Sequence, residues 1–379
     1  MTEPPAETTE VTRSTRDYDD LHRRLNAWIR TKLPGADPAI DDLVVPETNG
    51  MSSETVLFTL VSTGTAGRES VACVARIAPQ AQAVPVFPDY DFVKQYEIIR
   101  LVGERTAVPV PPLRWLELDD SHVGSPFFVM ERVDGIVPPD VMPYTFGSWV
   151  TEASPEDRRR LQDASVEVLA RVHSIDLTVG ERAFLEFDRP GDTPLRRHVQ
   201  EQRAYYEWVV ADDRPVPLLE RTFDWLDAHW PVDDADAVVS WGDSRIGNIL
   251  YRDFGPVAVL DWEMAGIGPR EMDLGWMIFL HRFMQDLAET MELPGLPGFM
   301  RVNDVAATYE DLTGYAPRDL EFYLVYAALR HGVVMSRVKQ RSVAFGQDVR
   351  PDDPDDMVMH RAALEAMLEG TSLPDTRTG

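Results

Sequence analysis

The sequence predicts an α+β fold with two lobes, a β-rich N-terminal lobe and a mostly helical C-terminal lobe. β-rich apolar runs occupy residues 55–61, 70–77 and 127–131, with one helical pattern before the last of them. From Ser154 onward helical patterns dominate instead. The chain has 379 residues, of which 44% are hydrophobic, and this is enough for two separate cores.

The two ends of the chain and its first helix are predicted from composition and spacing. Residues 1–16 are rich in Thr, Glu and Pro, so we expect a disordered tail there, and a second short tail at 371–379. From Asp17 the apolar residues fall at helical spacing until Pro34 and Gly35 stop the pattern. One amphipathic helix should therefore open the N-terminal lobe, which we place at 17–132.

The centre of the N-terminal lobe should be an antiparallel sheet with one helix. A glycine-containing turn at 64–67 separates the runs 55–61 and 70–77, so these two runs are expected to pair. Apolar residues between Phe92 and Val102 share one helical face. The sheet should thus be followed by a helix and closed by the buried strand at 127–131.

The C-terminal lobe, placed at 133–370, should be built mainly from helices. Ser154 and Pro155 have the character of an N-cap and a first-turn proline, and an apolar stripe follows them. Further helical patterns cover 194–210, 216–230, 271–290, 302–312, 317–339 and 355–369. Short β-rich segments interrupt them at 238–243, 248–252 and 257–261.

Composition excludes several classes of partner. The chain carries 37 basic and 64 acidic side chains, a formal charge of −27, which argues against nucleic acid and anionic membranes as partners and favours a cationic small molecule as the hydroxyl acceptor. The longest apolar run, at 322–329, is far shorter than the roughly 20 residues of a spanning helix. A single cysteine, Cys73, and an N-terminus without an apolar leader suggest a cytoplasmic protein.

The chemically informative stretch joins two carboxylates and an amide. Asp243 and Asn248 are five residues apart, and Asp261 ends an apolar strand just downstream. Phosphoryl transfer requires this D-x-x-x-x-N … D order, with one carboxylate for the acceptor hydroxyl and an amide and a carboxylate for Mg²⁺. A turn at 253–256 would form a hairpin and return Asp261 beside Asn248.

These residues resemble the aminoglycoside phosphotransferase and choline kinase family, which has a bilobal protein-kinase-like fold. The resemblance covers residues from about 40 to 340, and the family's loop reads H-G-D-x-x-x-x-N. Trp241 stands where His is usual. The spelling D-x-R-x-x-N, with Arg245, is most similar to the branch that is fused to some acyl-CoA dehydrogenases.

The resemblance implies a role for each motif residue. Asp243 matches the catalytic base, and Asn248 and Asp261 match the magnesium ligands. Arg245 lies where related kinases often carry a Lys near the γ-phosphate, so we expect it to stabilise charge in the transition state. An ion pair between Arg245 and a neighbouring acid such as Glu263 is an equal alternative.

The resemblance also assigns residues of the N-terminal lobe to the nucleotide. Ser52 and Ser53 lie in a small-residue segment similar to the family's phosphate loop. Arg76 occupies the place of the phosphate-binding Lys, and Glu97 matches its ion-pair partner. The alternatives are a polar turn at the two serines, a surface cation at Arg76 and a solvated helix residue at Glu97.

Two further positions follow from the same resemblance. The segment after the strand at 127–131 is similar to the hinge between lobes, where backbone groups of Glu131 and Val133 would bind adenine. Asp273 matches a carboxylate that braces the catalytic loop. Its apolar surroundings require buried hydrogen-bond partners.

The function implied is a Mg²⁺-dependent kinase that uses ATP or GTP and phosphorylates a hydroxyl group of a small molecule. The acceptor is left open between an aminoglycoside, an amino alcohol and a hydroxyacyl compound, as are the nucleotide and the oligomeric state. The alternative is a nucleotide-binding or regulatory module without turnover. Trp241 and Arg76, which differ from the family's usual His and Lys, favour this alternative. The retention of Asp243, Asn248 and Asp261 favours the enzyme.

Overall fold

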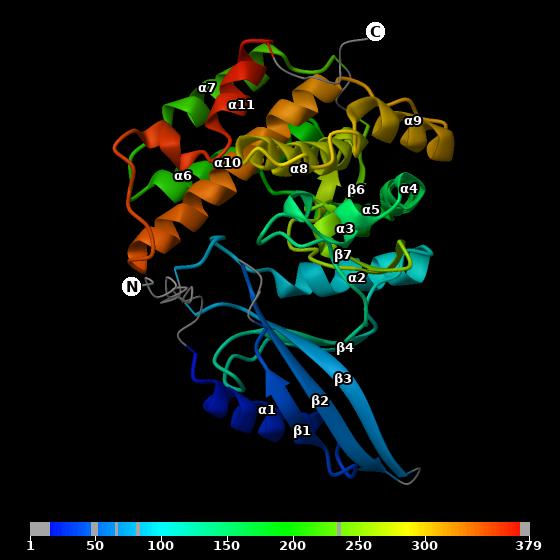
Figure 1. Ribbon diagram of the computed structural model, residues 1–379. Coiled ribbons are helices and arrows are strands. Elements are labelled where there is room, and N and C mark those ends of the chain that lie inside the picture. The colour runs from blue at the N-terminus through cyan, green and yellow to red at the C-terminus, as the bar shows by residue number, and fades with distance from the viewer. Residues whose placement is uncertain (1–15, 47–51, 65–66, 81–83, 233–235, 372–379) are drawn as a thin grey trace, which may run out of the picture.

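The computed structural model describes residues 16–46, 52–64, 67–80, 84–232 and 236–371. It has a sheet-containing N-terminal lobe and a larger helical C-terminal lobe, stacked one above the other in Figure 1. The predicted α+β, bilobal fold is confirmed. The predicted tails lie outside the described residues, apart from Arg16 and Thr371.

The N-terminal lobe is built on one five-stranded sheet with the order β1-β2-β3-β5-β4. All neighbouring strands are antiparallel, including the predicted pair β2 and β3. The strands are β1 (Ala39–Val44), β2 (Glu54–Gly64), β3 (Gly67–Ile77), β4 (Leu113–Glu117) and β5 (Phe127–Glu131). β1 and β4 are additions to the predicted sheet.

The two faces of this sheet are covered by different helices. α1 (Tyr18–Lys32) packs Trp28 against Phe127, whose rings are 4.7 Å apart. α2 (Phe92–Arg105) packs Phe92 on Phe128, the next residue of β5, because successive strand residues face opposite sides. Phe127 belongs to a core confined to the N-terminal lobe, whereas Phe128 joins the core that continues into the C-terminal lobe.

Arg16 was assigned to the disordered tail, and that assignment is wrong for this residue. Its side chain is buried, and Nε donates to Oε2 of Glu54 at 2.8 Å. It also donates to the carbonyl oxygen of Val123 at 2.8 Å. The sequence around Arg16 is polar and lacks periodicity, so nothing local indicated that a long-range ion pair holds it.

The C-terminal lobe contains the predicted helices in the predicted order, together with two short helices, α3 and α5, that were not predicted. Their bounds are α3 (Trp149–Glu152), α4 (Pro155–His173), α5 (Val179–Leu185), α6 (Pro194–Val210), α7 (Pro217–Ala228), α8 (Arg270–Thr290), α9 (Val302–Thr313), α10 (Leu320–Ala344) and α11 (Arg361–Leu368), with short 3₁₀ turns at Tyr144–Phe146 and Pro354–Met357. α4 begins as expected, with Ser154 as N-cap and Pro155 in the first turn. The single helix expected at 355–369 is instead a 3₁₀ turn followed by α11.

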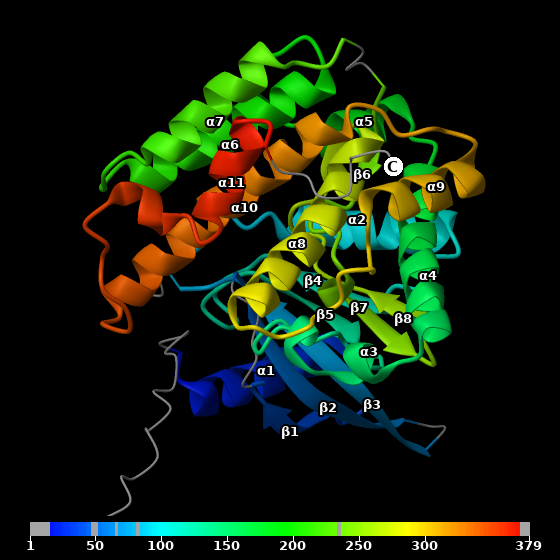
Figure 2. The ribbon, with the colours of Figure 1, turned by 45° about the horizontal axis from the view of Figure 1, so that its top comes forward.

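Two small antiparallel ribbons flank the residues of the predicted catalytic motif, Asp243, Asn248 and Asp261. β7 (Ile249–Arg252) and β8 (Gly255–Val259) form the predicted hairpin, visible beside α3 and α4 in Figure 2. β6 (Val238–Ser240) pairs with β9 (Gly266–Gly268). A 3₁₀ turn at Ile246–Asn248 joins the catalytic loop to β7.

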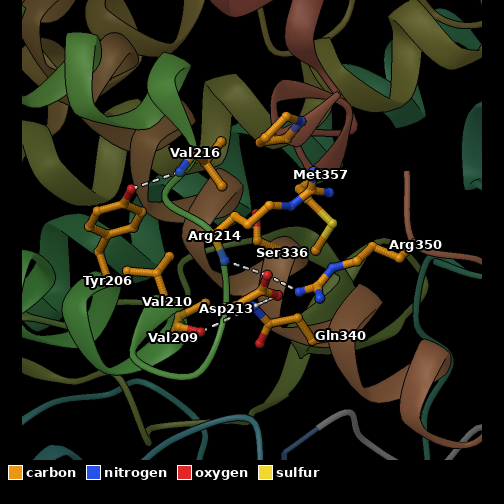
Figure 3. A pocket seen from close by; sticks show the side chains of 11 residues that line it. Tyr206, Val209, Val210, Asp213, Arg214, Val216, Ser336, Gln340, Arg350 and Met357 are labelled. Carbon is orange, nitrogen blue, oxygen red and sulfur yellow. Dashed lines mark hydrogen bonds and ion pairs between the residues drawn. The ribbon is translucent and has the colours of Figure 1, made fainter. Parts of the chain in front are cut away.

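The segment that follows α10 is joined to the end of α6 by the partly buried carboxylate of Asp213. Asp213 forms an ion pair with Arg350 and accepts from Nε2 of Gln340 at 2.9 Å, and Figure 3 shows these side chains around a small hollow. Within the described residues, no helix is both long and apolar enough to cross a membrane.

Candidate active site

Asp243 lies between β6 and the 3₁₀ turn, and three side chains hold its carboxylate. Oδ1 accepts from Nε1 of Trp276 at 2.7 Å. Oδ2 accepts from Nδ2 of Asn248 at 2.7 Å and from Nε of Arg245 at 3.2 Å. Because both oxygens are engaged in directed hydrogen bonds, the orientation of the carboxylate is fixed before any substrate binds.

Asp273 braces the loop from the first turn of α8. Its carboxylate, fully buried, accepts from His173 Nε2, the Ser240 hydroxyl and the backbone N–H groups of Trp241 and Gly242, at 2.8 to 3.0 Å. Burial opposes ionisation, but the hydrogen bond from His173 and the two backbone donors outweigh it and lower the pKa of Asp273. The carboxylate fixes the backbone just before Asp243.

Trp241 and Gly242, the two residues before Asp243, position the loop through a hydrogen bond and a close backbone contact. The indole Nε1 of Trp241 donates to the carbonyl of Leu260 at 2.9 Å, which ties the catalytic loop to the residue before Asp261. Gly242 has φ of 89°, and a Cβ there would lie 2.1 Å from the carbonyl oxygen of Met264. This position therefore requires glycine.

Asn248 and Asp261 lie at the same end of the β7–β8 hairpin. The backbone N–H of Leu260 donates to the carbonyl of Asn248 at 2.9 Å, so Asp261 is next to a residue paired with Asn248. The amide nitrogen of Asn248 is committed to Asp243, so a metal ion would bind this side chain through Oδ1. Asp261 adopts φ of 59°, and one carboxylate oxygen accepts from Nη2 of Arg76 at 2.7 Å.

Glu263, two residues further on, gives the site a third carboxylate beside those of Asp243 and Asp261. Burial and the nearby charge of Asp261 raise the pKa of Glu263 to about 8, against the opposing effect of Arg76. A divalent cation would relieve this repulsion, and carboxylate and amide oxygens are ligands that suit Mg²⁺. No group of three His, Cys, Asp or Glu side chains gathers as a metal site in the described residues, so the candidate set depends on the amide of Asn248.

The phosphate loop reaches the site through Ser52. Its hydroxyl donates to Oε2 of Glu263 at 2.7 Å, across the interface between the lobes. Ser53 is buried and its hydroxyl has no hydrogen-bond partner. The predicted loop spans residues 50–55, and its first two residues, Gly50 and Met51, lie outside the described residues.

Arg76 reaches the site, but its expected partner does not. Nη1 donates to the Thr55 hydroxyl at 3.0 Å, while Nη2 binds Asp261. Glu97 is instead bonded to Arg100, one turn further along α2, and 38% of its side chain is exposed. The ion pair expected between Arg76 and Glu97 is therefore absent.

The expected hinge follows β5 directly. The backbone N–H of Glu131 donates to the carbonyl of Pro112 at 2.8 Å, so its own carbonyl is the group it can offer to a base. Its side chain forms an ion pair at 2.6 Å with Arg114 of the neighbouring strand β4. Val133 is half-buried in the connection between the lobes.

Asp140 is a member of the site that sequence reasoning missed. It forms an ion pair with Nη1 of Arg245, so Arg245 joins Asp140 to Asp243. Burial disfavours the charge of Arg245, but these two carboxylates raise its pKa above the usual value. A Cβ at Gly247 would lie 2.7 Å from both Asp140 and Arg245, so the glycine makes room for the pair. Glu263, the alternative partner considered for Arg245, bonds to Ser52 instead.

Comparison with known proteins places this geometry in a family. A model described as "Phosphotransferase enzyme family" matches residues 48–295, which include Ser52, Arg76 and the whole catalytic motif. This range also contains both strands of the β7–β8 hairpin. The match therefore covers both sides of the candidate site.

Curated relatives include proteins named after a different activity. "Probable acyl-CoA dehydrogenase IBR3" of Arabidopsis thaliana is 23% identical over 263 residues, 65% of this chain and 31% of the relative. "Acyl-CoA dehydrogenase family member 11" of Homo sapiens is 30% identical over 169 residues, 44% of this chain and 20% of the relative. The chain thus spans a third or less of these relatives.

Solved structures share the fold. A "putative aminoglycoside phosphotransferase" from Ralstonia eutropha JMP134 superposes with a TM-score of 0.63 and 23% identity, over 92% of this chain and 97% of that one. Aminoglycoside phosphotransferase APH(4)-Ia, in a ternary complex with AMP-PNP and hygromycin B, gives 0.53 and 13%, over 92% and 98%. At these identities the likeness concerns the fold.

Proposed function

Because the chain belongs to the phosphotransferase enzyme family, we propose that it is a Mg²⁺-dependent kinase that transfers the γ-phosphate of ATP or GTP to a hydroxyl group of a small molecule. The observation that carries the proposal is the carboxylate of Asp243, held by Trp276, Asn248 and Arg245 at the end of a buried strand. A cytoplasmic location is part of the same proposal and rests on the single cysteine.

Asp243 acts on the acceptor hydroxyl in this mechanism. One carboxylate oxygen accepts a hydrogen bond from the hydroxyl and orients its oxygen toward the terminal phosphorus. The proton passes to the Asp243 carboxylate as the new O–P bond forms, and the bond to the leaving diphosphate breaks. Trp276 and Asn248 keep the carboxylate in place, so little reorganisation is needed during transfer.

The nucleotide would lie between the lobes, where the phosphate loop faces the hairpin. Arg76 would bind phosphate oxygens with the guanidinium that now binds Asp261, and Ser52 and Ser53 belong to the loop above them. Adenine or guanine would contact the carbonyl of Glu131 and the backbone N–H of Val133. The neighbour that binds AMP-PNP supports this use of the fold.

Asn248 and Asp261 would hold the magnesium ion, with Glu263 beside them. When bound, the ion supplies charge neutralisation for the nucleotide's phosphates. Arg245 complements this on the acceptor side, because its guanidinium lies against Asp243 and is shared with Asp140. Charge that develops on the transferred group therefore meets cationic groups from both lobes.

The acceptor is proposed to carry an apolar portion. Exposed apolar side chains gather on the segment that contains Asp140, at Ile136, Val137, Val141 and Met142. This segment reaches Arg245 and lies on the acceptor side of the loop. A hydroxyacyl compound fits such a surface better than an aminoglycoside, and the names of the curated relatives agree with an acyl substrate.

The test is phosphorus NMR with Mg-ATP and a panel of hydroxyacyl thioesters, amino alcohols and aminoglycosides. We expect one class to give a phosphorylated product, and Asp243→Asn to lower its rate about 10²- to 10⁴-fold. Asp253→Asn is the matched control, since Asp253 is exposed at the hairpin turn with φ of 49°, which Asn tolerates. Equal rates for wild type and Asp243→Asn would contradict the mechanism.

The second candidate is a nucleotide-binding module without turnover. Arg76 in place of Lys favours it, because a guanidinium lacks the compact charge of an ammonium. It predicts nucleotide binding with no product from any acceptor and no effect of Asp243→Asn. The engaged state of Asp243, Asn248 and Asp261 argues for the enzyme, since a module has no need of that arrangement.

A further inference from the structure

A hollow of about 510 Å³ lies outside the catalytic site, where the beginnings of α4 and α9 meet the segment 295–299. α4 and α9 pack against each other, so the hollow has firm walls on two sides. Its polar lining side chains are those of Thr151, Arg158, Arg159, Gln162, Arg301 and Asp304. The function proposed above uses none of them.

The charge of this lining is opposite to that of the chain. Three arginines, Arg158, Arg159 and Arg301, face one lining carboxylate, Asp304. The whole chain has 37 basic against 64 acidic side chains. A local excess of guanidinium groups on such an acidic protein favours an anion at this place.

The arginines are held in position by neighbouring groups. Nη1 of Arg158 donates to the carbonyls of Thr151 and Ala153 at 3.1 and 2.9 Å, and no carboxylate of the described residues pairs with it. Nε of Arg159 contacts both oxygens of Asp163 at 2.8 Å. The charge of Arg158 is thus oriented without being neutralised by an acid.

Arg301 is also held in position, at the N-terminus of α9. Its Nε donates to Oδ2 of Asp304 at 2.7 Å, and its side chain lines the hollow. Arg158 and Arg301 come from segments that are distant in sequence. A planar guanidinium from each side can bind two oxygens of one tetrahedral anion.

Gln162 supplies an independent indication of a ligand. It is 2% exposed, and its Oε1 accepts from the backbone N–H of Met300 at 2.8 Å. This bond fixes the orientation of the amide, and Nε2 is left buried without a partner. An unsatisfied buried donor costs about 1–3 kcal/mol, and an anionic oxygen, directly or through one water, would satisfy it.

The ends of the helices add fixed partial charge of the same sign. α4 and α9 both begin at the hollow, with 19 and 12 residues. The side chain of Arg301, the N-cap of α9, caps no backbone N–H group of that helix. The N-termini of two helices of this length favour an anion placed between them.

We propose that this hollow binds a phosphate group, either as inorganic phosphate or as the phosphomonoester of a small molecule. Arg158 and Arg301 hold its oxygens, Arg159 completes the cationic wall, and the amide of Gln162 donates from below. The proposal does not rest on the kinase activity. The site and the catalytic centre share no residue.

The segment 295–301 lies between this site and the acceptor side of the catalytic loop. The carbonyl of Leu296 is 3.1 Å from Nε2 of His281, and Nδ1 of His281 is 2.7 Å from the hydroxyl of Tyr144. Met300 lines a smaller hollow together with Arg245 and Asp140. A bound phosphate would therefore order a segment that contacts the residues around Arg245.

Isothermal titration of the full chain with inorganic phosphate, and separately with glycerol 3-phosphate, tests the proposal. We expect saturable binding of one ligand, weakened about tenfold or more in Arg158→Gln and Arg301→Gln. Gln162→Glu should abolish binding, because it replaces the buried donor with an anion. Tighter binding of one of the two ligands identifies the phosphate source.

Matched controls separate this site from others. Arg160→Gln changes the same charge on the neighbouring residue, which does not line the hollow, and should leave the affinity within about twofold. Arg76→Gln should also leave it unchanged. Thermal unfolding of each variant verifies the fold. No saturable binding below about 10 mM, an equal loss in Arg160→Gln, or a loss confined to Arg76→Gln would overturn the proposal.

Discussion

The two sides of the catalytic site are held in different ways. On the C-terminal side, the buried Asp273 carboxylate receives four hydrogen bonds, and Arg330 donates to the carbonyl of Gly242 at 3.0 Å. On the N-terminal side, Arg76 is bonded to Thr55 within its own lobe, and the side-chain contacts that reach the other lobe are those of Arg76 with Asp261 and Ser52 with Glu263. Both of these contacts cross between the lobes.

This difference separates a rigid half from an adjustable half. Hydrogen bonds to a buried charge are individually strong, and losing one partner leaves a desolvated group. Arg76 and Asp261 are partly exposed, at 12% and 19%, so water and ions weaken their attraction. We therefore expect the catalytic loop to be preformed and the N-terminal lobe to adjust when the nucleotide binds.

The largest effect is expected at Asp273. Asp273→Ala removes the acceptor of four hydrogen bonds and should lower the free energy of unfolding by about 3–5 kcal/mol. Urea unfolding monitored by tryptophan fluorescence measures the loss. Asp311→Ala, on the exposed side of α9, is the control and should change it by less than about 0.5 kcal/mol. A loss at Asp273 no greater than at Asp311 would remove the contrast between the two halves.

A smaller effect, of a different kind, is expected at Arg76. Arg76→Gln should leave the stability nearly unchanged but weaken AMP-PNP binding about 10- to 100-fold, the equivalent of one charge-assisted contact. Titration calorimetry with Mg-AMP-PNP measures the affinity. Arg68→Gln, at the other end of β3, is the control. If Arg76→Gln unfolds the lobe without changing the affinity of the folded fraction, the residue is structural.

The pH dependence of the metal-free chain reports on Glu263. Its pKa rises to about 8 in the folded state from an ordinary value of 4.5, so the protonated form stabilises the fold. This contribution is fully present below pH 4.5 and is lost as the pH rises through 8. The unfolding temperature should therefore fall more steeply between pH 5 and pH 9 in wild type than in Glu263→Gln. Parallel curves would contradict the raised pKa.

The smallest effect is expected at Gly247. The Cβ in Gly247→Ala meets only the ends of the Arg245 and Asp140 side chains, so both can shift at little cost. We expect the free energy of unfolding to change by less than about 1 kcal/mol, while the rate of phosphoryl transfer falls several-fold. Gly242→Ala is the contrast, since its Cβ meets backbone. Equal losses of stability in the two variants would contradict this distinction.

The C-terminal half of the site was predictable because its parts are close in sequence. Asp243, Asn248 and Asp261 lie within one loop and one hairpin, so spacing and turn chemistry fix their relation. The resemblance to the phosphotransferase family is confirmed as well. The individual roles of these residues stay predictions, which the experiments above test.

The other half depended on contacts that sequence spacing does not encode. The prediction that Glu97 pairs with Arg76 was wrong, although the helical periodicity of α2 argues against this pair. Phe92, Gln95, Ile98 and Val102 form the buried face of the helix, and Glu97 is not on that face. Asp140 is far upstream of Arg245 and had no local signal. α5 was missed despite a capping box at Thr178 and Glu181, which is readable in the sequence.

The most direct test of the central claim is the binding of Mn²⁺, as a probe for Mg²⁺, in the presence of AMP-PNP, followed by electron paramagnetic resonance. We predict one tightly bound ion per chain in wild type and in Asp253→Asn. Asp261→Asn and Asn248→Ala should each weaken its binding by about tenfold or more. Wild-type affinity in both variants would contradict the account, because the hairpin end would then not be the metal site.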